Sequence, residues 1–432
     1  MKYILLIGDG MGDTPVPELG DKTPLEAARK PTIDRLCAAA EPLLVRTVPN
    51  GYPPGSDVAN LSLLGYEPEK YYSGRAPLEA ASIGVEISDG ALAFRCNLVT
   101  VGVGNEGRLT MLDHSAGHIT TPEATELITA VQAACGTDQL RFYPGVSYRH
   151  LLIHQGDTPA SLSTVPPHDY LDQDVTEFYG QYLGVDYLAE LMQTSARVLT
   201  EHPINQQRAA EGKGMANSLW IWGEGKKPAM NTLQERHGIT GSLISAVDLL
   251  KGLGVCSGLE VPEVEGATGW LDTNYQGKVD AALDALTKQD FALVHVEAPD
   301  EAGHQGSATN KVRAIEDFDA KVVAPIVAEM DRRKEPYRLV VTMDHYTPIA
   351  RRTHEDWPVP MFIYDSRGVE QPAGTSYTEA NIIAAAEQSD RCLDSGAAFF
   401  TRFVTPNVTA NVMPNVTTEI ASDLSQDGED HG

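Results

Sequence analysis

The stretch Tyr3–Gly10 has the sequence YILLIGDG, and it predicts the first strand of the fold. Its five-residue apolar run ends at a Gly-Asp-Gly turn, and such a run is too short for the core of a signal peptide or for a membrane span. An apolar run closed by glycine predicts a buried β-strand, with Asp9 at its carboxyl end. No later window reaches about 18 consecutive apolar residues, so we expect a chain without membrane segments.

Short apolar runs and helical patterns alternate after this strand. The sequence runs YILLIG, PTIDRLCAAAE, PLLVRTV, which is the strand, helix, strand order of a parallel sheet. The same order returns late in the chain, in the segments NSLWIWG, SLISAVDLLKGLG, DFALVHVEAP, IEDFDAKVVAPIVAEM, YRLVVTMD and VPMFIYD. The prediction is an α/β fold with a mostly parallel sheet flanked by helices.

The composition changes between residues 88 and 178. Strand-like segments with Gly and Pro turns surround one helical pattern that opens on Thr121-Pro122, which predicts a smaller α+β inserted domain. The core is then discontinuous, formed by residues 1–87 and 179–405. Residues 406–432 are polar and acidic without an apolar face, so we expect a disordered tail.

Charge and cysteine content limit the partners and the compartment. The net charge is −27, from 60 acidic and 33 basic residues, and it disfavours nucleic acid and anionic membrane surfaces as partners. The five cysteines are far apart and lack C-x-x-C spacing, so neither a disulfide framework nor a zinc ribbon is expected. A cytoplasmic location fits best, and the sequence leaves the oligomeric state open.

Acidic and histidine side chains follow several of the expected strands. These residues are Asp9, Asp300, His304, Asp344, His345 and, further on, His354. The carboxyl ends of parallel strands converge on one crevice, so residues distant in sequence can meet there. Aspartate and neutral imidazole are ligands for divalent ions of the manganese, zinc or magnesium type. These six aspartate and histidine residues provide enough ligands for two ions rather than one.

Each of these residues also has a purely structural interpretation. An aspartate after a strand is usually a turn residue, and Asp300 with His304 has the i, i+4 spacing of an ordinary helix-face pair. We interpret His295, inside LVHVE, as a strand histidine and not as a ligand. The occurrence of all these residues together is the argument for a site, because four separate loops would otherwise have acquired Asp or His by accident.

Ser56 lies in the segment PPGSDVANLSLLG, residues 53–65, just ahead of a helical pattern. Serine at such a place commonly caps a helix. A hydroxyl next to a metal centre could instead act as a nucleophile, because a bound metal lowers its pKa. The segment alone favours capping, and only a nearby set of metal ligands would favour chemistry.

Several segments together resemble the cofactor-independent phosphoglycerate mutases of the archaeal type, within the alkaline phosphatase superfamily. The resemblance runs from Met1 to about Thr405, and five motifs occur in the family's order: GDGMGD, PPGSDVANLSLLGYEPEKYYSGRAPLEAA, AFRCNLVT, HVEAPDEAGH and DHYTPIARRTHEDWPVP. The resemblance implies an alkaline-phosphatase-like core and the interconversion of 3-phosphoglycerate and 2-phosphoglycerate.

The resemblance also implies a two-metal site with Ser56 as nucleophile. Ser56 would take up the phosphoryl group as phosphoserine and pass it back, without 2,3-bisphosphoglycerate. Manganese is the expected metal, with magnesium, zinc and cobalt as alternatives. One ion would be held by Asp9, Ser56, Asp344 and His345, and the other by Asp300, His304 and His354.

A mutase of this kind needs an enclosed site so that the released glycerate stays bound. We expect the inserted domain to form the lid and to supply cations for a small phosphorylated substrate, since arginine makes bidentate contacts with phosphate and carboxylate. The candidates are Arg75, Arg95, His114, His118, Arg149 and His150.

One position departs from the mutase pattern. Asn60 stands where these mutases usually carry histidine, and the surrounding sequence is closer to that of a subgroup proposed to act as homoserine kinases. A phosphotransferase that uses a nucleotide donor at the same site is therefore the alternative, although the chain has no G-x-x-x-x-G-K-[ST] loop. A non-catalytic metal- or phosphate-binding protein is the third hypothesis.

Overall fold

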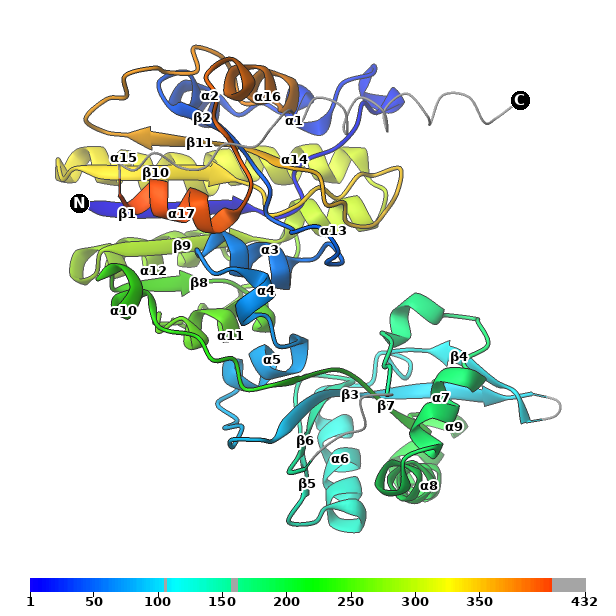
Figure 1. Cartoon of the computed structure of the whole chain (residues 1–432). Helices are drawn as coiled ribbons and strands as arrows, with labels where there is room; N and C mark the ends of the chain where they lie inside the picture. Colours follow the sequence, from blue (N-terminus) through cyan, green and yellow to red (C-terminus); the bar gives the residue numbers. More distant parts are fainter. Residues whose placement is uncertain (105–106, 157–161, 406–432) are drawn as a thin grey trace. The chain divides into compact units, whose positions relative to one another are not determined.

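The chain folds into two compact units in a computed structural model that describes residues 1–104, 107–156 and 162–405 (Figure 1). The first unit comprises residues 1–72 together with the chain from Met230 onward, and the second comprises Ser73–Ala229. The first unit is therefore discontinuous in sequence, with the second inserted after its first 72 residues.

The first unit is built on a seven-stranded sheet with the order β12-β2-β11-β10-β1-β9-β8. Only β11 runs antiparallel to its neighbours, and the other pairs in this sheet are parallel. The expected α/β fold with a mostly parallel sheet is thus confirmed. The strands are β1 (Lys2–Gly8), β2 (Glu41–Val45), β8 (Gly241–Ile244), β9 (Phe291–Val296), β10 (Tyr337–Thr342), β11 (Val359–Asp365) and β12 (Cys392–Leu393).

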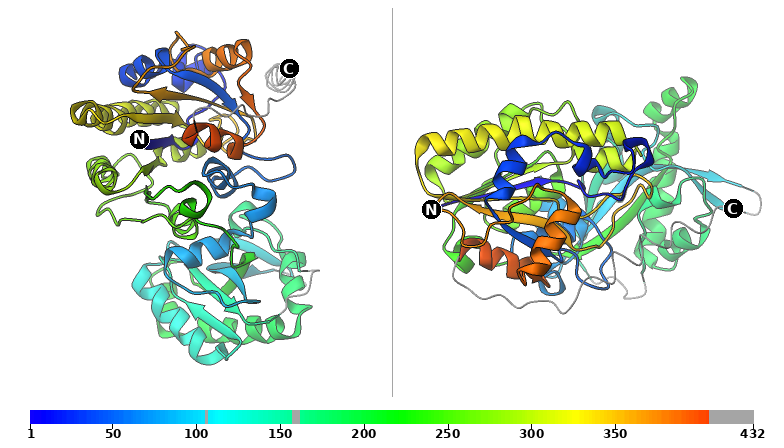
Figure 2. Two further views of the ribbon diagram at one scale, coloured as in Figure 1. Left: turned by 60° about the vertical axis from the view of Figure 1, so that its left-hand side comes forward. Right: turned by 90° about the horizontal axis from the view of Figure 1, so that it is seen from above.

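Helices cover both faces of this sheet (Figure 2). Helix α12 packs on β8 and β9 and on the segment between α14 and α15, whereas α3 packs against α11 and α17. The helical elements of the unit are η1 (Pro17–Leu19), α1 (Pro24–Ala27), α2 (Pro31–Ala38), α3 (Ser56–Leu63), α4 (Pro68–Tyr71), α10 (Leu233–His237), α11 (Asp248–Cys256), α12 (Tyr275–Lys288), α13 (Ala298–His304), α14 (Ala308–Phe318), the π-helix η4 (Asp319–Val323), α15 (Ala324–Arg333), α16 (Glu379–Gln388) and α17 (Gly396–Val404).

The central strand β1 fixes the place of the candidate ligands. It pairs in parallel with β9 on one side and β10 on the other, with Gly8 opposite Val296 and Ile7 opposite Thr342. Strands covered on both faces are apolar throughout, and all six residues of β9 and of β10 are buried. The three carboxyl ends therefore lie at one edge of the sheet (Figure 1).

The second unit contains an antiparallel sheet centred on β3, which pairs with β4, β6 and β7, while β5 pairs with β6. Its strands are β3 (Leu92–Val103), β4 (Leu109–Asp113), β5 (Leu140–Tyr143), β6 (Arg149–His154) and β7 (Ser218–Lys226). Its helices are α5 (Arg75–Ser82), α6 (Thr121–Cys135), η3 (Pro167–Tyr170), α7 (Thr176–Leu183), α8 (Asp186–Glu201) and α9 (Pro203–Ala210).

This unit, Ser73–Ala229, spans more residues than the insertion expected at 88–178. The segment NSLWIWG was assigned to the parallel sheet, but it forms β7 and pairs antiparallel with β3, with Leu219 opposite Leu98. An apolar run has the same pattern in either sheet, so its pairing partner could not be inferred from the run itself. The expected tail at 406–432 lies outside the described residues.

None of the helices in the described ranges is both long enough and apolar enough to cross a lipid bilayer.

Candidate active site

The candidate ligands of the first unit come from loops at the carboxyl edge of the parallel sheet. Asp9 directly follows β1, Asp300 and His304 lie on α13 just after β9, and Asp344 and His345 follow β10. The register of β1 with its two neighbours brings these loops together. The convergence expected from the sequence is therefore present in the structure.

One cluster consists of Asp300, His304 and His354, whose ligand atoms all lie within 4.8 Å of one another. His304 Nε2 is 3.2 Å from Asp300 Oδ2, and His354 Nε2 is 3.5 Å from Asp300 Oδ1. The two imidazole Nε2 atoms are 2.9 Å apart. Two neutral imidazoles cannot both direct lone pairs at each other at this distance, so a proton or a cation has to stand between them.

The adjoining cluster contains Asp9, Asp344 and His345, which are all buried. His345 Nε2 is 3.6 Å from Asp9 Oδ1 and 3.5 Å from Asp344 Oδ2. Ligand atoms of Asp9, Asp300 and His345 also lie within 4.8 Å of one another. The two clusters are therefore contiguous.

Ser56 is the first residue of α3, and Gly55 occupies the N-cap position. The Ser56 hydroxyl lies 3.1 Å from His345 Nε2 and 3.5 Å from Asp9 Oδ2. The N-cap residue is Gly55 and not Ser56, and the Ser56 side chain lies within hydrogen-bond distance of two residues of the ligand cluster. The positive end of the α3 dipole lies at the same place and favours negative charge there.

The charge balance of the site calls for cations. Burial, followed by the neighbouring carboxylates of Asp344 and Asp300, raises the pKa of Asp9 well above its usual value. The Asp9 Oδ1 atom is buried and accepts no hydrogen bond. Buried carboxylates this close cannot all be ionised without compensating charge. Aspartate oxygens and imidazole nitrogens are donors that divalent ions accept, so the residues present fit such a group.

The histidines present the same ring nitrogen to the centre. His304 Nδ1–H donates to the carbonyl of Arg352 at 2.9 Å, and His354 Nδ1–H donates to the carbonyl of Pro54 at 3.3 Å. A carbonyl can only accept, so these bonds leave Nε2 of each ring directed at Asp300. Hydrogen bonds of this kind fix the ring orientation of metal-binding histidines.

Two residues of the site were not assigned a role from the sequence. His295 does lie in a strand, β9, but its Nε2 is 2.9 Å from Asp9 Oδ2, and it forms a third possible ligand group with Asp9 and Asp344. The available signal was a histidine inside an otherwise apolar buried strand, since a buried polar group needs a partner. Asn60 Nδ2 donates to the carbonyl of Ser56 and to Asp344 Oδ2, both at 2.8 Å. It therefore ties helix α3, which begins at Ser56, to a candidate ligand.

The second unit gathers three of the predicted substrate contacts. Arg95 is buried on β3, its Nε lies 3.0 Å from Glu79 Oε2, and its guanidinium stacks on the Trp222 ring at 4.2 Å. Burial lowers the pKa of Arg95 to about 10 against the opposing effect of Glu79, and Arg75 and Arg149 contribute to the decrease. Arg75 and Arg149 therefore both lie close enough to Arg95 to repel its charge.

Three histidines of this unit occupy different environments. The His114 ring lies 6.1 Å from the ring of His168. Burial lowers the pKa of His168 to about 4, and Arg75 and Arg95 contribute to the decrease. His168 is thus the histidine near the arginines, and sequence reasoning missed it. His118 is exposed on the turn after β4.

His150 is 2% exposed and lies opposite Cys96 in the core, and burial lowers its pKa to about 3. Neighbouring strand residues face opposite sides, which explains why Arg149 is exposed and His150 is not. His150 therefore lies on the face of the sheet opposite to Arg149, and its contact with the substrate stays a prediction.

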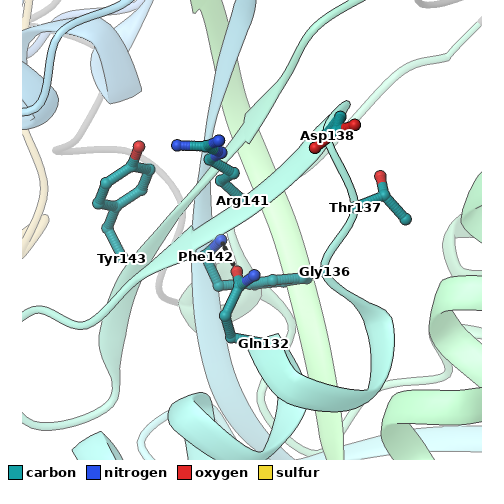
Figure 3. A pocket seen from close by; sticks show the side chains of 7 residues that line it. All are labelled: Gln132, Gly136, Thr137, Asp138, Arg141, Phe142 and Tyr143. Carbon is teal, nitrogen blue, oxygen red and sulfur yellow. Dashed lines mark hydrogen bonds between the residues drawn. The ribbon is translucent and has the colours of Figure 1, made fainter.

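A hollow of about 630 Å³ in the second unit lies beside β5 and the end of α6 (Figure 3). It is lined by Gln132, Gly136, Thr137, Asp138, Arg141, Phe142 and Tyr143. None of the predicted site residues is among them, so volume alone does not mark the chemistry in this unit.

Known proteins resemble this chain over most of its length. A profile of the 2,3-bisphosphoglycerate-independent phosphoglycerate mutases matches residues 41–205. A protein of Geobacter sulfurreducens named probable 2,3-bisphosphoglycerate-independent phosphoglycerate mutase is 52% identical over 379 residues, which are 88% of this chain and 94% of the relative. The chain belongs to this family. A Methanosarcina acetivorans member is 48% identical and covers 87% of this chain and 94% of its own length.

Solved structures agree with this assignment. A Pyrococcus horikoshii protein is 26% identical, with a TM-score of 0.77, and covers 95% of this chain and 99% of its own. The cofactor-independent phosphoglycerate mutase of Thermoplasma acidophilum is 27% identical, with a TM-score of 0.57, over 88% of this chain and 95% of its own. The family resemblance stated from the motifs is confirmed, and none of these relatives is named a kinase.

Proposed function

We propose that this family member interconverts 3-phosphoglycerate and 2-phosphoglycerate through a phosphoserine at Ser56, with two divalent ions bound beside it. The observation that carries the proposal is the Ser56 hydroxyl 3.1 Å from His345 and 3.5 Å from Asp9, within a buried group of carboxylates and imidazoles. The site residues assigned from the motifs support the same arrangement.

The transfer needs one bond exchange in each direction. Ser56 Oγ loses its proton and forms a bond to phosphorus, while the ester bond between phosphorus and the glycerate oxygen breaks and that oxygen takes up a proton. The other glycerate hydroxyl then loses its proton and attacks the phosphoserine, and the departing Ser56 Oγ takes up a proton, so that both the serine and the proton count are restored. Bound divalent ions would supply the positive charge that favours the serine alkoxide and the phosphoryl oxygens in such a transfer. Asp9, Asp344 and His345 would hold one ion, and Asp300, His304 and His354 the other.

Asn60 positions Ser56 relative to Asp344 and does not itself take part in the transfer. Its amide bonds both the Ser56 carbonyl and the Asp344 carboxylate, so it holds the nucleophile at a fixed distance from a ligand. A productive site requires that the reacting groups stay aligned, since a misplacement of about 1 Å can lower the rate about 100-fold. The departure from histidine at this position is compatible with the mutase reaction, because the amide performs a positioning task that does not depend on the acceptor.

The arginines of the second unit are the proposed contacts for the substrate's anionic groups. Arg75 and Arg149 each repel Arg95, whose Nε lies 3.0 Å from Glu79 Oε2. A phosphate or carboxylate would relieve that repulsion and accept bidentate bonds. The lid role of this unit, the contacts of His114 and His118, manganese as the metal and the cytoplasmic location stay predictions.

Metal binding should release protons, because His304 has to be neutral to act as a ligand. Burial acts to lower the pKa of His304, but its hydrogen bond with Asp300 outweighs that effect and raises the pKa to about 9. The metal-free protein therefore carries this proton below pH 9, and Mn²⁺ affinity should rise about tenfold per pH unit from pH 7 to 9. Calorimetry at pH 7.5 in buffers of different ionisation enthalpy measures the release. His304→Gln should release one proton fewer, and binding without proton release would contradict the expectation.

The test of the proposed function is a coupled enolase assay that starts from 3-phosphoglycerate. With Mn²⁺ and without nucleotide, we expect turnover that is unchanged when 2,3-bisphosphoglycerate is added. A parallel reaction contains ATP and homoserine and follows ADP formation. Phosphorylation of homoserine without mutase turnover would instead support the kinase alternative, and no turnover in either reaction would support the non-catalytic hypothesis.

A further inference from the structure

Thr347 lies where the metal-ligand loops of the first unit meet. It is completely buried, and its Oγ1 is 2.5 Å from Asp300 Oδ1 and 3.3 Å from His345 Nδ1. Asp300 belongs to one proposed ligand set and His345 to the other. The Thr347 hydroxyl therefore bridges the two sets.

The backbone around this hydroxyl is packed with almost no spare room. A Cβ atom on Gly10, which has a φ of +58°, would lie 2.4 Å from Thr347 Oγ1 and 2.7 Å from Asp300 Oδ1. A Cβ atom on Gly303 would lie 2.5 Å from the Thr347 carbonyl oxygen. These glycines directly adjoin Asp9 and His304 in sequence. Both ligand loops thus approach Thr347 so closely that only glycine fits.

A buried ammonium group fixes Thr347 from the other side. Lys311 Nζ donates to the carbonyls of Thr347 and Gly12, at 2.8 and 2.9 Å, and to Asp13 Oδ2 at 2.8 Å. The hydroxyl therefore sits on a segment that is anchored to the loop after β1.

Hydrogen-bond directions follow from the number of protons available. The carboxylate of Asp300 accepts, so Thr347 donates its single hydroxyl proton there. Its oxygen can then only accept from His345, which requires the proton of that ring to be on Nδ1. The unprotonated Nε2 is left facing Ser56 Oγ at 3.1 Å.

We propose that Thr347 is a positioning residue that holds His345 in its Nδ1–H tautomer and couples the two metal-binding halves of the site. This inference rests on the proposed two-metal function. The Thr347 hydroxyl orients the His345 ring, just as backbone carbonyls orient the rings of His304 and His354. Unlike those carbonyls, it also bonds Asp300, which belongs to the other ligand set. Removing it should therefore weaken both halves together.

The test compares Thr347→Val, which keeps the shape and loses the hydroxyl, with Thr347→Ser, which keeps the hydroxyl. Calorimetric titration with Mn²⁺ should show affinity lowered about 10- to 100-fold in the valine variant and within about threefold of the wild type in the serine variant. NMR of the metal-free protein with ¹⁵N-labelled histidine reports the tautomer, and the His345 signal is assigned by its loss in His345→Gln. We expect Nδ1–H in the wild type and in Thr347→Ser, and a shift toward Nε2–H in Thr347→Val.

Equal Mn²⁺ affinity and an unchanged tautomer in Thr347→Val would overturn the proposal. An Nε2–H tautomer in the wild type would overturn it without any variant, so the test does not depend on the valine protein folding. Wild-type protein that binds no Mn²⁺ would instead count against the two-metal function itself.

Discussion

Replacement of Ser56 by alanine should lower kcat for the conversion of 3-phosphoglycerate by at least about 10⁴-fold, because loss of a nucleophile removes the covalent route altogether. The hydroxyl lies within hydrogen-bond distance of Asp9 and His345, and the N-cap position of α3 is held by Gly55. The fold should therefore survive the change. The measurement is the coupled enolase assay together with a thermal melt of each protein.

A matched control is Ser389→Ala, which removes a hydroxyl that donates to the Ala385 carbonyl at the end of α16. That variant should keep wild-type turnover. A second readout is independent of rate: rapid quenching followed by mass spectrometry should find one phosphoryl group on the peptide that contains Ser56. Substantial activity in Ser56→Ala, or a phosphoryl group on another residue, would show that the nucleophile is misassigned.

Replacement of Lys311 by methionine should lower the free energy of unfolding by about 3–5 kcal/mol, the usual cost of leaving one partner of a buried ion pair uncompensated. Lys311 and Asp13 are both completely buried at their side chains, with Nζ 2.8 Å from Oδ2. Methionine fills the space of the aliphatic stem but removes the ammonium from two carbonyls and from the Asp13 carboxylate, which keeps only the backbone donors of Thr14 and Ile349. Urea unfolding of the metal-free chain, followed by circular dichroism, measures the loss.

The exposed pair between Lys288 and Asp284 provides the comparison. Its atoms are 3.0 Å apart, and the two side chains are 72% and 69% exposed. Solvent screening reduces the worth of such a pair, so Lys288→Met should change the free energy of unfolding by no more than about 0.5 kcal/mol. Similar losses in the two variants would mean that burial adds nothing to the Lys311 interaction.

The sequence was sufficient to predict the convergence of Asp9, Asp300 and Asp344 because parallel strands determine where their ends lie. Apolar runs show which segments are strands, and the rule that parallel carboxyl ends share one edge supplies the rest. The sequence boundaries of the second unit could not be predicted in the same way. The strand β7 owes its place to antiparallel pairing with β3, and a pairing between distant segments leaves no local mark in either one.

The residues that support the ligands were also beyond sequence reasoning. Thr347 and Lys311 act through contacts between segments 36 residues apart, and neither has a spacing that separates it from an ordinary surface threonine or lysine. Asn60 was recognised as unusual, but its task became clear only from the two acceptors of its amide. The number of acceptors around one donor is a property of the folded chain.

The sequence separation of β1 from its two neighbours affects how the protein is made. Strand β1 ends at Gly8, whereas β9 and β10 begin at Phe291 and Tyr337. During translation the first strand therefore stays unpaired while the contiguous second unit, Ser73–Ala229, is completed. The ribosome has to release His345 and His354 before either of the two proposed ligand sets is complete. On the proposed two-metal function, metal would be captured late in biosynthesis, and a nascent chain that stalls early would carry no assembled centre.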